Sequence, residues 1–178
     1  MGRPYVDYKN KMVGQRVDYD NAYWYQCVDL FKDYCSKVLG YAYGHTGSAK
    51  EIWINKNYIF RDDRHRIKGM TDLMQWDVIC STNGLNGHIA IVDHILWDIP
   101  YVLEQNGSGV NPWSWTGDNA IRVHPYPRSF WAGVWRCKKI EDNLAIEQKF
   151  IADKLKKKLT AADKKNTLDY QATLIYKL

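Results

Sequence analysis

The sequence has 178 residues and a formal net charge of +5. This length suits one globular domain with room for an appendage, and 46% hydrophobic with 25% charged residues excludes a disordered chain. No apolar run reaches the length that spans a membrane, and the N-terminus lacks the apolar core of a signal peptide. We therefore expect a protein without a membrane span that is made in a cytoplasm.

The first part of the sequence favours helices. Apolar residues recur at helical spacing through residues 22–39, and Gly40 is a typical stop. A short helical turn is expected around residues 49–55. The rest of residues 40–72 mixes Gly, Asn, Tyr and charged residues, which favours loops.

Short apolar runs separated by turn residues predict β-strands in the next part of the chain. These runs are residues 76–80, 88–93, 101–105, 120–124 and 134–138. Helices followed by a succession of strands predict an α+β domain, in which the N-terminal helices pack on an antiparallel β-sheet.

The composition changes after Lys138. No Gly, Pro or Trp follows, and apolar residues between Leu144 and Leu159 form a helical stripe among Lys and Glu. We predict a folded domain over residues 1–138 and a helical tail or linker over residues 139–178. Residues 138–178 hold ten Lys and six acidic residues, a net +4, which leaves +1 for the rest.

The basic tail is open to two interpretations. Its charge favours an anionic partner, and a solvated helix face explains it equally well. We expect no nucleic-acid partner, because the lysines lack the interleaved aromatic residues on which bases stack.

The aromatic and cysteine residues are also informative. Eight Trp and thirteen Tyr indicate an aromatic core, or else an aromatic surface for saccharide or peptide; we favour the core. The four Cys show neither CxxC nor metal-finger spacing. Cys35, Cys80 and Cys137 have apolar neighbours, so we interpret them as small core residues.

Cys27 stands apart because it begins the apolar stripe of the predicted helix. A thiol at the start of a helix meets the positive end of the helix dipole, which favours the thiolate. His88 follows Gly87, which permits close backbone approach, and it begins a predicted strand. His94 is a competitor for the same role, since it shares the His88 side of an ideal strand.

Glu104 and Asn106 flank Gln105 in a predicted strand, so we expect both to point to one face. The carboxylate can fix the tautomer of an imidazole, and the amide can orient the ring or help to hold an oxyanion. A thiol, an imidazole and a carboxylate together make a cysteine hydrolase. Taken singly, each of these residues also fits a purely structural role.

Three acidic residues lie close to Cys27 in the sequence. Asp18 and Asp20 form an Asp-x-Asp loop and Asp29 returns nearby, which gives the hard oxygen ligands that Ca²⁺ prefers. Their spacing is not that of an EF-hand. From spacing alone, helix-capping and turn roles explain these residues as well as a metal does.

The order of these motifs resembles one family. Gln26-Cys27-Val28-Asp29-Leu30, then Gly87-His88-Ile89-Ala90, then Glu104-Gln105-Asn106 resemble the CHAP cysteine peptidoglycan hydrolases. The similarity covers residues 5–137, and it departs at Trp76, where the family has Gly. It implies a papain-like fold of the NlpC/P60-CHAP superfamily.

The resemblance also implies residue roles. Cys27 would be the nucleophile, His88 the base, Glu104 the orienting acid and Asn106 a polar assistant. Gln26, or the backbone amide of Cys27, would hold the oxyanion.

Phage lysins of the family carry a calcium loop immediately before the cysteine. The resemblance maps the carboxylates of that loop to Asp18, Asp20 and Asp29. Its backbone-carbonyl positions map to Ala22 and Trp24. Bound Ca²⁺ is therefore expected at these residues.

The function that follows from the resemblance is cleavage of an amide bond in bacterial peptidoglycan by a bacteriophage endolysin. The bond is either the N-acetylmuramoyl–L-alanine amide or a peptide bond of the stem or cross-bridge. Without a signal peptide, the chain would reach the wall after release through a holin pore, or as part of a virion. The tail would serve self-association or wall binding.

Two alternatives remain open. The NlpC/P60 peptidases place their cysteine in Asp-Cys-Ser and often use a second His, unlike the Gln-Cys-Val-Asp and Glu-x-Asn of this chain. A non-catalytic wall-binding or virion tail module would use the Trp-rich surface instead.

Overall fold

The computed structural model describes residues 5–40, 47–55, 70–71, 73–107, 119–137 and 148–153, together with the backbone of residues 64–67. The chain divides into two units, residues 1–143 and 144–178. In the second unit the described residues, 148–153, are helical. The rest of the predicted tail and the boundary between residues 138 and 139 lie outside the described residues and stay predictions. No helix in the described part of the chain combines the length and the apolar character that crossing a membrane requires.

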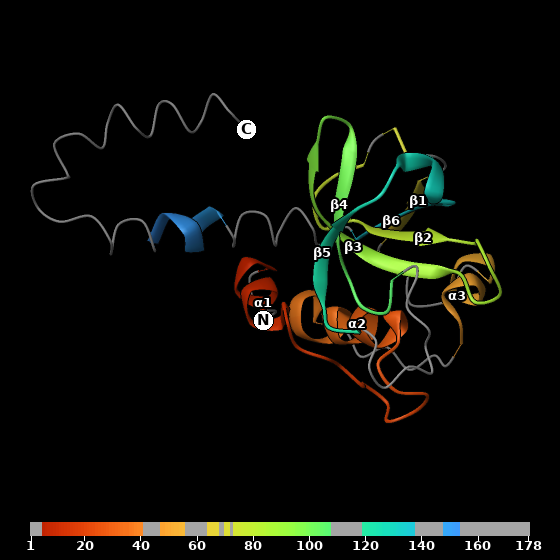
Figure 1. The fold of residues 1–178 in the computed structure, drawn as a ribbon. Helices are drawn as coiled ribbons and strands as arrows, with labels where there is room; N and C mark the ends of the chain where they lie inside the picture. Colours follow the sequence, from red (N-terminus) through yellow and green to blue (C-terminus); the bar gives the residue numbers. More distant parts are fainter. Residues whose placement is uncertain are drawn as a thin grey trace, which may run out of the picture. The chain divides into compact units, whose positions relative to one another are not determined.

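A six-stranded sheet forms the centre of the first unit, with strand order β1-β6-β2-β3-β4-β5 and every neighbouring pair antiparallel. The strands are β1 (Arg64–Ile67), β2 (Val78–Ser81), β3 (His88–Leu96), β4 (Ile99–Glu104), β5 (Arg122–Pro125) and β6 (Gly133–Cys137). Figure 1 shows α1 and α2 on the same side of this sheet and α3 at the end where β2 turns into β3. The predicted α+β class is confirmed.

The helices are α1 (Tyr5–Met12), α2 (Cys27–Tyr34) and α3 (Ala49–Ile54), with a π-helical turn η1 (Cys35–Leu39) and a 3-10 turn η3 (Arg128–Phe130). The prediction of one helix over residues 22–39 was wrong at its start. Asn21, Tyr23 and Trp24 have φ of 57°, 60° and 61°, a left-handed backbone that a helix cannot include. Gly40, at φ 75°, ends the segment as predicted.

The five predicted strands are all present, with shifted ends. Trp76 has φ 72°, so β2 begins only at residue 78. An irregular register between Val92 and His94 lets β3 continue past the predicted end. β4 starts earlier and ends at Glu104, which removes residues 105 and 106 from the strand.

Two elements have no apolar pattern from which they could be predicted. β1, Arg-His-Arg-Ile, is defined by its backbone pairing with β6. α1 buries Tyr5 and Tyr8, and their hydroxyls donate to Asp93 (3.1 Å) and Asp33 (2.9 Å). Hydrogen bonds of these two hydroxyls and packing of their rings on Tyr34 and Trp76 therefore attach α1 to the domain.

The core is aromatic, as favoured from the sequence. Of the Trp residues within the described ranges, those at 53, 76, 131 and 135 are buried, while Trp24 and Trp97 are 40% and 88% exposed. Cys35, Cys80 and Cys137 are buried and not in disulfides, which confirms their core interpretation. Cys27, by contrast, is only half-buried.

Candidate active site

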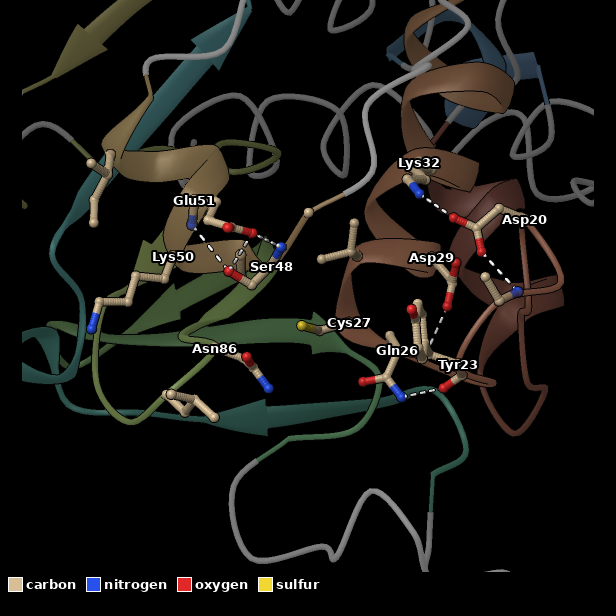
Figure 2. Close-up of a pocket in the computed structure, with 16 residues that line it drawn as sticks. Asp20, Tyr23, Gln26, Cys27, Asp29, Lys32, Ser48, Lys50, Glu51 and Asn86 are labelled. Atoms are coloured by element: carbon tan, nitrogen blue, oxygen red, sulfur yellow. Dashed lines mark hydrogen bonds and ion pairs between the residues drawn. The ribbon is translucent and has the colours of Figure 1, made fainter.

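Cys27 is the first residue of α2, and its sulfur points into a cleft (Figure 2). One wall of the cleft is the loop before α2 together with α2 itself. The other wall is α3 and the turn before β3. The cleft has a volume of about 760 Å³ and is lined by Asp20, Ala22, Tyr23, Gln26, Cys27, Val28, Asp29, Lys32, Gly47, Ser48, Ala49, Lys50, Glu51, Ile54, Leu85 and Asn86.

His88, the first residue of β3, lies beside Cys27. Its Nε2 is 2.9 Å from Oε2 of Glu104, which leaves Nδ1 for the hydrogen bond between the ring and Cys27. The ring also stacks on Trp131, at 5.9 Å between centroids and an interplanar angle of 29°. At the preceding residue, Gly87, a Cβ would lie 2.4 Å from the carbonyl oxygen of Ser81. The close approach expected at Gly87 is therefore present.

The electrostatics favour a charged imidazole. Burial alone would lower the pKa of His88, but hydrogen bonds to Cys27 and Glu104, and their charges, outweigh it and raise that pKa from 6.5 to about 9. At neutral pH the ring is an imidazolium. It is the positive partner that a reactive cysteine sulfur requires.

Glu104 is completely buried and accepts from several donors. Besides His88, Arg122 Nε donates to Oε1 at 2.9 Å and the Tyr126 hydroxyl donates to Oε2 at 2.8 Å. Burial raises the pKa of Glu104, but these hydrogen bonds, with that of His88 first, bring it below its usual range. At Gly107 a Cβ would lie 2.3 Å from this carboxylate, so a side chain there would displace it.

Asn106 does not share the face of Glu104, and that expectation was wrong. Because β4 ends at Glu104 and Asn106 has φ 55°, its side chain turns toward the loop before Cys27. There Nδ2 donates to Oε1 of Gln26 at 3.0 Å, while the buried Oδ1 has no hydrogen-bond partner. Asn106 thus touches the residue expected to hold an oxyanion, and its role stays a prediction.

Gln105 is a site residue that the sequence analysis missed. Its amide pairs with both backbone groups of Val17, at 2.8 and 2.7 Å, and also donates to the carbonyl of Gln26 at 3.0 Å. Three consecutive residues therefore act together: Glu104 holds His88, Gln105 holds the loop before α2, and Asn106 holds the side chain of Gln26. No periodicity in the sequence signals this, since Gln105 is a polar side chain with 0% exposure.

Gln26 caps the start of α2. Its Nε2 donates to the carbonyl of Tyr23 at 2.6 Å, and its backbone N–H donates to Oδ2 of Asp29 at 2.8 Å (Figure 2). One hydrogen of the Gln26 amide is therefore already engaged. Its role toward an oxyanion, like that of the Cys27 N–H, stays a prediction.

His94 is separated from this site. Its Nδ1 pairs with Oδ2 of Asp93 at 2.8 Å, and its ring stacks on Tyr101 at 4.5 Å. The irregular register after Val92 breaks the ideal alternation that had made it a competitor of His88.

The three acidic residues near Cys27 do come together. Asp18, Asp20 and Asp29 each offer a carboxylate oxygen within 4.8 Å of the others. Oδ1 of Asp18 is buried without a hydrogen-bond partner, and this orphaned acceptor fits a cation ligand. Burial raises the pKa of Asp29 to about 6, with the charge of Asp20 adding to the effect.

The remaining contacts of the loop involve Asp20. Its Oδ1 accepts the Ala22 N–H at 3.0 Å, and Oδ2 forms an ion pair with Lys32 (Figure 2). The carbonyls of Ala22 and Trp24 as metal ligands stay a prediction.

The fold of this chain is similar to that of solved structures. Neither the family models nor the curated proteins contain a match to this chain. Among solved structures, the chain is similar to one titled "Crystal structure of a wild type endolysin LysIME-EF1", with a TM-score of 0.62 and 24% identity over 78% of this chain. The match spans 65% of that protein's length. At this identity the likeness is one of fold.

Replacing Glu104 by Gln should lower the pKa of His88 by about one unit or more, because the variant loses the negative charge beside the ring. NMR titration of the His88 ring measures this directly. A Glu51→Gln variant makes the same change at another cleft residue, whose carboxylate accepts the backbone N–H of Ser48. It should leave the pKa of His88 near 9. An unchanged pKa in Glu104→Gln would contradict the coupling.

The same shift sets the sign of a stability effect. Since the folded-state pKa of His88 lies above 6.5, the protonated ring stabilises the fold below pH 6.5, and this contribution is lost as the pH rises through about 9. The pH dependence of the unfolding free energy across that window should therefore flatten in Glu104→Gln.

Proposed function

We propose that this chain is a cysteine hydrolase that cleaves amide bonds of bacterial peptidoglycan, as a phage endolysin of the CHAP type with a papain-like fold. The observation that carries the proposal is the alignment of Cys27, which lines a cleft, with the buried His88 and Glu104. The fold likeness to a protein titled an endolysin supports this choice of substrate. The motif order that resembles the CHAP hydrolases supports it independently.

The proposed reaction uses two acyl transfers. The Cys27 sulfur attacks the amide carbonyl, and the His88 imidazolium gives its proton to the departing amine, which leaves a thioester. The neutral ring then takes a proton from water, whose oxygen attacks the thioester carbonyl. Collapse of that intermediate releases the acid and restores the Cys27 sulfur and the His88 imidazolium.

Glu104 has a positioning role in this scheme. Its carboxylate accepts the Nε2–H, so Nδ1 remains the nitrogen that faces the sulfur and the leaving amine. The Cys27 N–H at the start of α2 and the Gln26 amide are the proposed oxyanion donors. Asn106, through its bond to Gln26, would hold that amide in place.

The identity of the third residue favours CHAP over NlpC/P60. In this chain the imidazole is bonded to a carboxylate that is itself held by Arg122 and Tyr126, rather than to a second histidine. The half-buried thiol in a cleft also favours an enzyme over a non-catalytic wall-binding module.

We propose that Asp18, Asp20 and Asp29 bind Ca²⁺, with the carbonyls of Ala22 and Trp24 as further ligands. The orphaned Asp18 oxygen and the proximity of the three carboxylates support this site. A bound divalent cation supplies positive charge that joins the loop to α2. The same loop carries Gln26, so the conformation of the loop determines the position of the proposed oxyanion donors.

Cys27→Ala should abolish the release of soluble fragments from purified peptidoglycan, because the variant has no nucleophile. Mass spectrometry of the released fragments also identifies the bond, through a peptide with a new L-Ala amino terminus for the amidase or a new stem or cross-bridge end for the endopeptidase. Cys137→Ala makes the same change at a buried residue away from the cleft and should retain activity. Undiminished release by Cys27→Ala would overturn the nucleophile, and wild-type chain that binds walls without ever cutting them would favour the binding module.

Millimolar Ca²⁺ should raise the melting temperature of the wild-type chain by several degrees relative to a chelator, because the ion binds only the folded loop. Asp18→Asn should remove this gain. Asp7→Asn, a change on α1 where Asp7 pairs with Lys11, should keep it. Equal melting temperatures of the wild type with Ca²⁺ and with chelator would contradict the site.

A further inference from the structure

Lys32 is the basic residue at the carboxylate cluster. It lies in the second turn of α2, and its side chain is only 4% exposed. An ammonium group removed from water requires a compensating charge, and Lys32 finds it in Oδ2 of Asp20. Figure 2 shows this contact immediately beside Asp29.

Both carboxylate oxygens of Asp20 have a partner. Oδ1 accepts the N–H of Ala22, and Oδ2 is taken by Lys32. Asp29 is also engaged, through the N–H of Gln26, whereas one oxygen of Asp18 is unpaired. Three carboxylates and one ammonium therefore share this small volume, and the ammonium offsets part of the repulsion between the acids.

We infer that Lys32 is a built-in counter-ion of the loop, which occupies the cation's place at Asp20 when no metal is bound and competes with Ca²⁺ for that carboxylate. This inference rests on the calcium site proposed above. It gives the lysine two effects of opposite sign. It stabilises the metal-free loop, and it weakens metal binding.

The physical reason is the geometry of the contact. Ca²⁺ binds carboxylate oxygens at about 2.3–2.6 Å, so an ion on Asp20 would lie within a few ångströms of the ammonium that contacts Oδ2, and the two positive charges would repel each other. The ion must displace Lys32 from Asp20 or bind close to the positive charge of Lys32. Either route costs free energy in a partly buried site, where charges are weakly screened.

Titration of the intact chain with Ca²⁺ by isothermal calorimetry tests this inference. Lys32→Met keeps the length of the side chain and removes its charge. It should bind Ca²⁺ at least about tenfold more tightly than the wild type, the usual scale of coupling between two ligands of one group. In chelator it should melt at a lower temperature than the wild type, since the carboxylates then repel one another without compensation.

Matched variants separate charge from packing. Lys32→Arg keeps the charge and should bind Ca²⁺ as weakly as the wild type. Lys37→Met removes a lysine that pairs with Asp33 outside the cluster and should also leave the affinity unchanged. If Lys32→Met does not fold, which circular dichroism will show, Lys32→Gln makes the same loss of charge.

The outcomes distinguish the inference from the site on which it rests. Equal affinities of the wild type and Lys32→Met would overturn the role of Lys32 and leave the calcium site standing. No binding by either chain would overturn both. Tight binding that persists when Asp18→Asn is added to Lys32→Met would place the ion elsewhere and also overturn the inference.

Discussion

The buried contact between Glu104 and His88 is the constraint on which the site depends. A carboxylate with no exposure to water persists as an anion only if donors surround it, and Glu104 has His88, Arg122 and Tyr126. Together with Cys27, this anion raises the pKa of the imidazole, and its bond to Nε2 leaves the other ring nitrogen for Cys27. The charge of the imidazole thus depends on Cys27 and on this desolvated carboxylate together.

The sheet supplies the geometry for this contact. His88 begins β3 and Glu104 ends β4, its neighbour in the sheet, while the antiparallel register places Arg122 of β5 opposite Glu104. Gln105 then leaves the strand and fastens the loop that precedes Cys27. A single strand end therefore aligns the base and positions the nucleophile. The hydrogen bonds that these residues make explain why the segment is polar and yet buried.

The sequence predicted what local patterns encode. Cys27 at a helix start and His88 at a strand start were predictable, because an apolar stripe and a β-branched run mark those elements. The supporting contacts of Arg122 and Gln105 depend on which strands pair and where β4 stops, and no local pattern carries that information. The error at Asn106 has the same cause, since alternation applies only while the strand continues.

The rate at which iodoacetamide alkylates Cys27 at neutral pH, followed by intact mass and peptide mapping, tests the coupling of sulfur and ring most directly. Because the other three cysteines are buried, Cys27 should be modified first in the wild type. In His88→Gln it should react much more slowly, since the positive charge beside the sulfur is gone. Equal rates in the two chains would contradict the account.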